Sequence, residues 1–135
     1  MIDKLAYLAC PYSHVNSQIM EARYRAACRA AAKLMRSGQN VYSAISHTHG
    51  MTIYGGMKGD WDTWKRLDMV YLDLSESLYV LMLPGWKTSE GVNEEIEYAR
   101  MINIPLHYLP AAYADYEKNS EEKGISKSYN SAEAS

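Results

Sequence analysis

The chain has 135 residues, of which 47% are hydrophobic and 22% are charged, and its formal net charge is −2. This length predicts one domain with its own core and excludes two ordinary domains. The slight acidity gives no electrostatic reason to expect nucleic acid as a partner. Cys10 and Cys28 are too few for a disulfide framework and are expected to be reduced thiols. No apolar run approaches the roughly 20 residues that span a bilayer, and no signal-peptide layout is visible, so we expect a soluble, cytoplasmic protein with no membrane partner.

The first half of the chain predicts two strands around a long helix. Residues 5–10 form a short apolar run closed by Pro11, which is typical of a buried strand. Residues 19–37 carry an apolar stripe at helical spacing, with basic residues largely outside it, as on a solvated helix face. Residues 40–43 predict a second strand. Residues 44–59 contain several glycines and two histidines without a sustained period, so we expect a long loop, and such loops are often functional.

The second half of the chain is organised around one buried strand. Residues 60–74 begin with a good N-cap and predict a helix whose broad apolar face also holds Asp68. A buried unpaired carboxylate is costly, so Asp68 is either paired with a basic residue at the edge of the stripe or part of a site. The run 78–83 is apolar at every position, as in a strand buried on both faces of a parallel sheet. Helical spacing resumes near Ser89, and residues 104–109 predict a last strand.

The alternation of strands and helices predicts an α/β fold. We expect a flavodoxin-like or Rossmann-like three-layer sandwich with a parallel sheet of four or five strands, in the order 2-1-3-4 or 2-1-3-4-5. The folded domain is expected over residues 1–112. From Tyr113 the composition shifts to Glu, Lys, Ser and Asn, which predicts a polar and partly mobile tail over residues 113–135.

Polar residues follow several of the predicted strands, where open α/β sheets bind ligands. Tyr12 and Ser13 follow the first strand, and His47, with a second histidine two residues on, follows the second. The two histidines could contact substrate, but without a third nearby they do not make a zinc site. Trp86 follows the central strand and could be an aromatic lid or could stack on a base. Ser89 could cap its helix, and the free N–H groups there could also hold a phosphate.

Two carboxylates are candidates for the chemistry. Asp68 and Glu95 come from different helices, and convergence of two carboxylates on one cleft is what retaining cleavage of a glycosidic bond requires. One carboxylate attacks the anomeric carbon while the other protonates the leaving group. The neighbouring Glu94 is expected to point elsewhere on its helix.

These residues resemble a known group of enzymes, the nucleoside 2-deoxyribosyltransferase-like superfamily, which includes the 2′-deoxynucleoside 5′-phosphate N-hydrolases and the CMP hydrolases. The residues that carry the resemblance are Tyr7, Asp68, Ser89, Gly91, Glu95 and Ala99. The Pro-Tyr-Ser segment at 11–13 and the Leu-Pro-Gly-Trp segment at 83–86 are closer to an uncharacterised bacterial and phage branch, the DUF1937 family. The resemblance covers residues 5 to about 109.

The resemblance implies a role for each matched residue. Glu95 matches the glutamate that attacks C1′ of the sugar, Asp68 the aspartate that assists departure of the base, and Tyr7 a tyrosine that orients the glutamate. Ser89 matches a serine that the nucleotide hydrolases use for the 5′-phosphate. Their Gly-Ser-x-Arg phosphate loop is replaced here by residues 10–13, Cys-Pro-Tyr-Ser, which lack the arginine.

We therefore expect an N-glycosidase that acts on a nucleoside or nucleoside 5′-monophosphate through a covalent glycosyl-glutamate and releases free base. The alternatives are a nucleoside 2-deoxyribosyltransferase that exchanges bases and a nucleotide-derivative binding protein without turnover. Neither a metal nor an organic cofactor is expected, because the carboxylates do the chemistry. Relatives complete each site with a residue from a neighbouring subunit, which implies a homodimer or a higher homo-oligomer. The expected substrate-binding residues are Ser89, Gly91, Tyr12, Ser13, Trp86 and His47.

Overall fold

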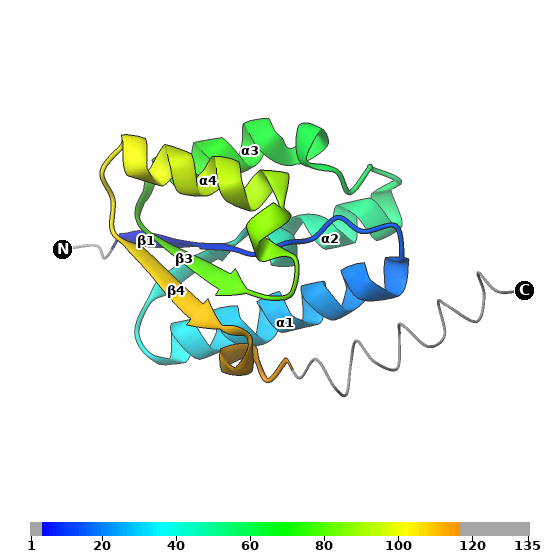
Figure 1. Ribbon diagram of the computed structural model, residues 1–135, viewed down its shortest axis with the longest axis horizontal. Coiled ribbons are helices and arrows are strands. Elements are labelled where there is room, and N and C mark those ends of the chain that lie inside the picture. The colour runs from blue at the N-terminus through cyan, green and yellow to red at the C-terminus, as the bar shows by residue number, and fades with distance from the viewer. Residues whose placement is uncertain (1–3, 117–135) are drawn as a thin grey trace, which may run out of the picture.

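A parallel sheet of four strands forms the centre of the part of the chain that the structure describes, residues 4–116 (Figure 1). In this computed structural model the strand order is β2-β1-β3-β4, and all three neighbouring pairs are parallel. The strands are β1 (Leu5–Ala9), β2 (Asn40–Ser43), β3 (Ser75–Met82) and β4 (Leu106–Pro110). The predicted Rossmann-like α/β architecture is confirmed, with the shorter of the two predicted strand orders.

Helices cover both faces of this sheet and make the outer layers of the sandwich. The helices, in chain order, are α1 (Ser17–Arg36), α2 (Ala44–Gly55), α3 (Trp61–Asp73), the 3-10 helix η1 (Trp86–Thr88), α4 (Glu90–Met101) and the 3-10 helix η2 (Ala111–Ala114). Figure 1 shows α3 and α4 side by side above the sheet and α1 below it. None of the helices within residues 4–116 has the length and apolarity needed to cross a membrane.

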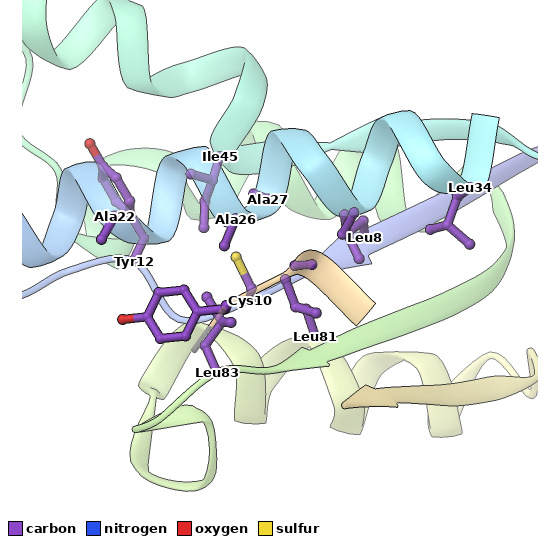
Figure 2. Close-up of a cluster of buried hydrophobic side chains, with 13 residues drawn as sticks. Leu8, Cys10, Tyr12, Ala22, Ala26, Ala27, Leu34, Ile45, Leu81 and Leu83 are labelled. Carbon is purple, nitrogen blue, oxygen red and sulfur yellow. The ribbon is translucent and has the colours of Figure 1, made fainter. Parts of the chain in front are cut away.

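Burial on both faces explains the apolar run of β1. Leu8 and Cys10 belong to the core that α1 covers, whereas Tyr7 and Ala9 belong to the core under α3 and α4. Figure 2 shows the α1 side, where small side chains of the helix bring its backbone close to Leu8, Leu81 and other apolar groups of the sheet. The buried alanines of this helix are Ala22, Ala26, Ala27 and Ala30. Successive side chains of a strand point to opposite faces of the sheet, and this alternation places Tyr7 on the α4 side.

The expected loop over residues 44–59 is wrong, because most of it is α2. Ser43 caps this helix by accepting a hydrogen bond from the Ser46 N–H, and Gly56 ends it in a left-handed conformation at φ 70°. Two glycines and several β-branched residues make the segment a poor helix former on its own. Its buried residues cluster near its start and pack against β1, β2 and α1, so tertiary packing stabilises it. The other predicted elements agree with the structure to within three residues at each end.

The packed structure continues past residue 112. Ala114 and Tyr116 are buried in the core beneath α1, and the Arg29 side chain donates a 2.6 Å hydrogen bond to the Ala114 carbonyl. These contacts hold the segment after β4 against α1. The remainder of the predicted tail, residues 117–135, lies outside the described residues.

Candidate active site

A cavity of about 550 Å³ opens at the carboxyl ends of β1 and β3. After β1 the chain crosses to the α1 face of the sheet, and after β3 it crosses to the α4 face. The two loops therefore diverge, which makes the gap between β1 and β3 the topological switch point where open α/β sheets bind ligands. The cavity wall comes from these two loops and from residues of α1, α2, α3 and α4.

Six of the nine residues predicted for the site line this cavity. They are Glu95, Asp68, Ser89, Gly91, Tyr12 and Ser13. Tyr7 lies beneath the cavity floor in the core under α4. Trp86 and His47 are not brought to it. Counting Ser89 with α4, which it caps, these nine residues come from six separate elements or loops, so the fold brings together most of what the sequence pattern singled out.

Asp68 and Glu95 are the two buried carboxyl groups of the cavity, whose lining also includes the exposed Asp60 and Glu90. Asp68 lies in the middle of α3 and Glu95 in the second turn of α4, and both side chains are buried, with exposed fractions of 5% and 4%. No basic residue pairs with Asp68 within residues 4–116, and its Oδ1 has no hydrogen-bond partner there. The paired, stripe-edge alternative for Asp68 is therefore not observed, and the costly burial of this carboxyl is typical of a site.

Burial makes both carboxyl groups weak acids. It raises the pKa of Asp68 to about 7. It also raises the pKa of Glu95 to about 8, where the Asp68 charge adds to the rise and the Tyr7 hydroxyl opposes it. Because the two groups interact, they titrate as a pair that retains at least one proton near neutral pH. A cavity that holds one carboxylate and one carboxylic acid can supply both a nucleophile and a proton donor.

Tyr7 lies on β1, in the core that α4 covers, and its hydroxyl acts on the ionisation of Glu95. Its side chain is fully buried, and burial followed by the nearby Glu95 and Asp68 charges raises the pKa of its hydroxyl, which therefore stays protonated as a donor. Within residues 4–116 the hydroxyl has no hydrogen-bond partner. It lowers the pKa of Glu95, as a hydrogen-bond donor to that carboxylate does. Tyr7 is thus set to stabilise the ionised form of Glu95.

Ser89 and Ser13 contribute hydroxyl groups to the cavity while tying down local structure. Ser89 is the N-cap of α4, as predicted, and accepts a 3.3 Å hydrogen bond from the Val92 N–H. Ser13 donates a hydrogen bond to the Gly59 carbonyl and so joins the loop after β1 to the loop before α3. The start of α4 also presents free backbone N–H groups and the positive end of the helix dipole, which favour an anion.

His47 and Trp86 lie away from the cavity for reasons of local geometry. His47 is exposed and faces Tyr42 and Tyr71, and because α2 is a helix, residue 49 points about 200° away from it. His49 is the buried one, where its Nδ1 meets the Tyr12 hydroxyl at 2.7 Å. The turn at Gly85 directs Trp86 toward Tyr108 of β4, with ring centroids 5.8 Å apart.

Arg23 is a cavity residue that the sequence reasoning missed. It is buried in α1, and its guanidinium donates to the carbonyls of Ser13 at 2.9 Å and Pro84 at 3.1 Å. It thereby joins the two loops that form the switch point and brings a cation to the cavity wall. The hydrolases that the chain resembles carry their phosphate-binding arginine in the loop after the first strand, where this chain has Cys-Pro-Tyr-Ser and no arginine. The usable signal was that Arg23 falls in the alanine stripe, at helical spacing from Ala26 and Ala27.

Trp61 is the second residue that was missed. It begins α3 and lines the cavity, whereas Trp86 does not. Its indole N–H donates a hydrogen bond to the Glu94 carboxylate, which also pairs with Lys65 at 3.0 Å. Glu94 therefore points away from the cavity, as predicted, although it touches one of the residues of the cavity wall.

The fold and the cavity together define a class: a three-layer α/β domain with a small-molecule site at its switch point and two buried carboxyl groups inside it. Among the described residues, no three His, Cys, Asp or Glu side chains lie close enough to hold a metal ion. The chain belongs to the DUF1937 family, described as a domain of unknown function, whose model matches residues 4–109. No curated protein matches the chain.

Proposed function

We propose that this protein cleaves the N-glycosidic bond of a nucleoside 5′-monophosphate or a nucleoside through a covalent glycosyl-glutamate. The observation that carries the proposal is the pair of buried carboxyl groups, Asp68 and Glu95, which come from two helices to one switch-point cavity and both have raised pKa values. The resemblance of the site residues to the nucleoside 2-deoxyribosyltransferase-like superfamily supports the same chemistry.

The proposed first step uses the singly protonated form of the pair in which Glu95 is ionised and Asp68 holds the proton. Because the pKa of Glu95, about 8, lies above that of Asp68, about 7, this is the less populated of the two singly protonated forms, and the Tyr7 hydroxyl favours it. The Glu95 carboxylate attacks C1′ of the sugar, the bond from C1′ to the base nitrogen breaks, and its electron pair leaves with the base. The Asp68 carboxylic acid donates its proton to the departing base. In the second step the Asp68 carboxylate accepts a proton from water, and the resulting hydroxide attacks C1′ and releases Glu95. In a transferase a second base would replace water.

A cation on the cavity wall favours a substrate with a 5′-phosphate. Arg23, the hydroxyls of Ser13 and Ser89 and the N-terminus of α4 all contribute to the cavity. Guanidinium groups, hydroxyls and helix N-termini are the usual partners of phosphate oxygens in proteins. Arg23 would thus take the place of the arginine that is absent from the loop after β1.

Replacing Arg23 with glutamine is expected to raise the KM for nucleoside monophosphates by about 10- to 100-fold more than the KM for free nucleosides. The reason is that a contact to the phosphate is lost only with the monophosphate, whereas the loss of the hydrogen bonds to the Ser13 and Pro84 carbonyls affects both substrates alike. Steady-state kinetics with matched nucleoside and nucleotide pairs would measure this. Arg25→Gln, which removes an exposed arginine of the same helix, is the control. An equal loss with both substrates would exclude a phosphate contact.

Replacing Tyr7 with phenylalanine is expected to shift the activity profile toward higher pH. Removing the hydroxyl removes an interaction that lowers the pKa of Glu95, so that pKa rises and less carboxylate is present at neutral pH. We expect a loss on the order of tenfold at pH 7 and a smaller one at pH 9. The kcat/KM measured from pH 5 to 9 reports this, with Tyr108→Phe on β4 as the control. A uniform loss at every pH would assign Tyr7 a purely structural role.

The function is tested by incubating the protein with nucleosides and their 5′-monophosphates and assaying free base. A 2-fluoro sugar analogue should leave a covalent adduct on Glu95 that mass spectrometry of the digested protein can locate. Base release only in the presence of a second base would identify a transferase. Tight binding without base release or adduct would instead identify a nucleotide-derivative binding protein.

A further inference from the structure

The indole of Trp61 is held against the start of α4 by close packing. Trp61 is half-buried at the first position of α3, and its six-membered ring lies over Gly91. A Cβ atom at position 91 would lie 3.0 Å from Trp61 Cε3 and 3.2 Å from Cδ2, so any side chain larger than hydrogen would push the indole. The glycine at this position is therefore explained by the approach of the ring.

The polar edge of the same indole is held by a second residue of α4. The indole N–H donates to the Glu94 carboxylate, and Lys65 pairs with the other oxygen of that carboxylate at 3.0 Å. Glu94 is three residues after Gly91 and hence on the same side of the helix. One side of α4 thus fixes the ring by contact at Gly91 and by a hydrogen bond at Glu94.

The position of Trp61 relative to Asp68 determines which part of a substrate the indole can contact. The two residues are seven apart on α3, two helical turns, so they share one face, and both line the cavity. Under the proposed function Asp68 gives its proton to the departing base. The base must therefore lie beside α3, where the indoles of Trp61 and Trp64 both line the cavity. Trp64 is buried, with an exposed fraction of 7%, so the half-buried Trp61 presents the more accessible flat surface.

We propose that Trp61 is the stacking platform for the base and that Glu94 is the positioning residue that holds it. The inference rests on the proposed function, since it takes the substrate to carry an aromatic base. An aromatic ring that is already fixed loses little conformational entropy on stacking, so holding it in place favours affinity. Glu94, the neighbour of the nucleophile, then contributes to substrate binding without touching the substrate.

Trp61→Ala is expected to raise the KM by about 10-fold or more with a smaller change in kcat, because stacking contributes mainly to binding. Trp61→Phe retains a ring and should stay within about threefold of wild type. Trp86→Phe, outside the cavity, is the matched control and should leave the KM unchanged. If Trp61 only joined α3 to α4, both substitutions at 61 would lower stability without this split between KM and kcat, and that result would overturn the inference.

The positioning role is tested by coupling. Glu94→Ala should raise the KM in the wild-type background but add nothing in the Trp61→Ala background, because its effect passes through the ring. Glu94→Gln keeps an acceptor for the indole N–H and should recover much of the lost affinity. Glu97→Ala, an exposed glutamate of the same helix paired with Arg100, is the control. Additive effects in the double variant would remove Glu94 from this role.

A binding experiment separates this inference from the proposed function. Tryptophan fluorescence is measured while nucleoside monophosphates are added to the wild type, to Trp86→Phe and to Trp61→Phe. Quenching in the first two proteins and its loss in the third would support stacking on Trp61, even if the wild type released no base and the proposed function failed. Base release by the wild type with no Trp61-dependent quenching would overturn the inference and leave the proposed function standing.

Discussion

Glu95→Gln is expected to lower the rate of base release by about a thousandfold or more, the effect typical of losing a covalent nucleophile. The amide has nearly the shape of the carboxyl group but cannot attack C1′, so no glycosyl ester forms. The substitution also removes a buried ionisable group whose pKa is raised to about 8, so it should not destabilise the folded protein. Free-base assays and circular dichroism of the same samples measure the two outcomes.

The control for this loss is Glu97→Gln on the same helix, which is exposed and lies outside the cavity. It should release base at the wild-type rate. A 2-fluoro sugar analogue adds a second readout, since the wild type should gain the mass of the sugar and the Glu95→Gln variant should not. Activity retained in Glu95→Gln would remove this residue from the nucleophile role, and an adduct on another residue would identify the replacement.

The elements that were predicted well are those whose environment is uniform along the segment. The central strand β3 is buried on both faces and therefore reads as an unbroken apolar run, and α1 presents one alanine-rich stripe to the sheet. The helix α2 was missed because its contacts change along its length: its first turns are buried, while its last turn is exposed. Such a helix has no period to detect, and only the neighbours it packs against stabilise it.

The residues of the candidate site also divide into those that local sequence spacing predicts and those that only packing between distant elements brings to the cavity. Ser89 and Glu95 lie on one short segment whose spacing is visible in the sequence, and the structure places both in the cavity. Arg23 and Trp61 reach the cavity through packing between elements distant in sequence: α1 against two loops, and α3 against α4. Local spacing carries no information on those contacts. Trp86 was predicted for the site because it follows a strand, but the turn at Gly85 directs its ring toward β4.

Glu95→Gln should also stabilise the protein, and the gain should depend on pH. In the folded chain the pKa of Glu95 is raised to about 8, whereas in the unfolded chain it is near its ordinary value of 4.5. Below the ordinary value both states are protonated and the carboxyl group costs nothing. As the pH rises toward 8, the unfolded chain loses its proton while the folded chain retains it, so the free energy of unfolding of the wild type falls. At pH 8 we expect the variant to be more stable by on the order of 4 kcal/mol.

Urea unfolding of wild type and Glu95→Gln at pH 4, 6 and 8 measures this gain without knowledge of the substrate. The difference between the two proteins should be small at pH 4, grow through pH 6 and level off above pH 8. Asp68→Asn should show the same trend over a lower pH range, up to the raised pKa of Asp68 of about 7. The double variant should gain less stability than the sum of the two single gains, because the two charges interact. Glu97→Gln, an exposed control, should show no such trend. If the difference in the free energy of unfolding between wild type and Glu95→Gln stays constant from pH 4 to pH 8, Glu95 titrates as an ordinary glutamate. That result would contradict the inference that the buried carboxyl pair retains a proton near neutral pH.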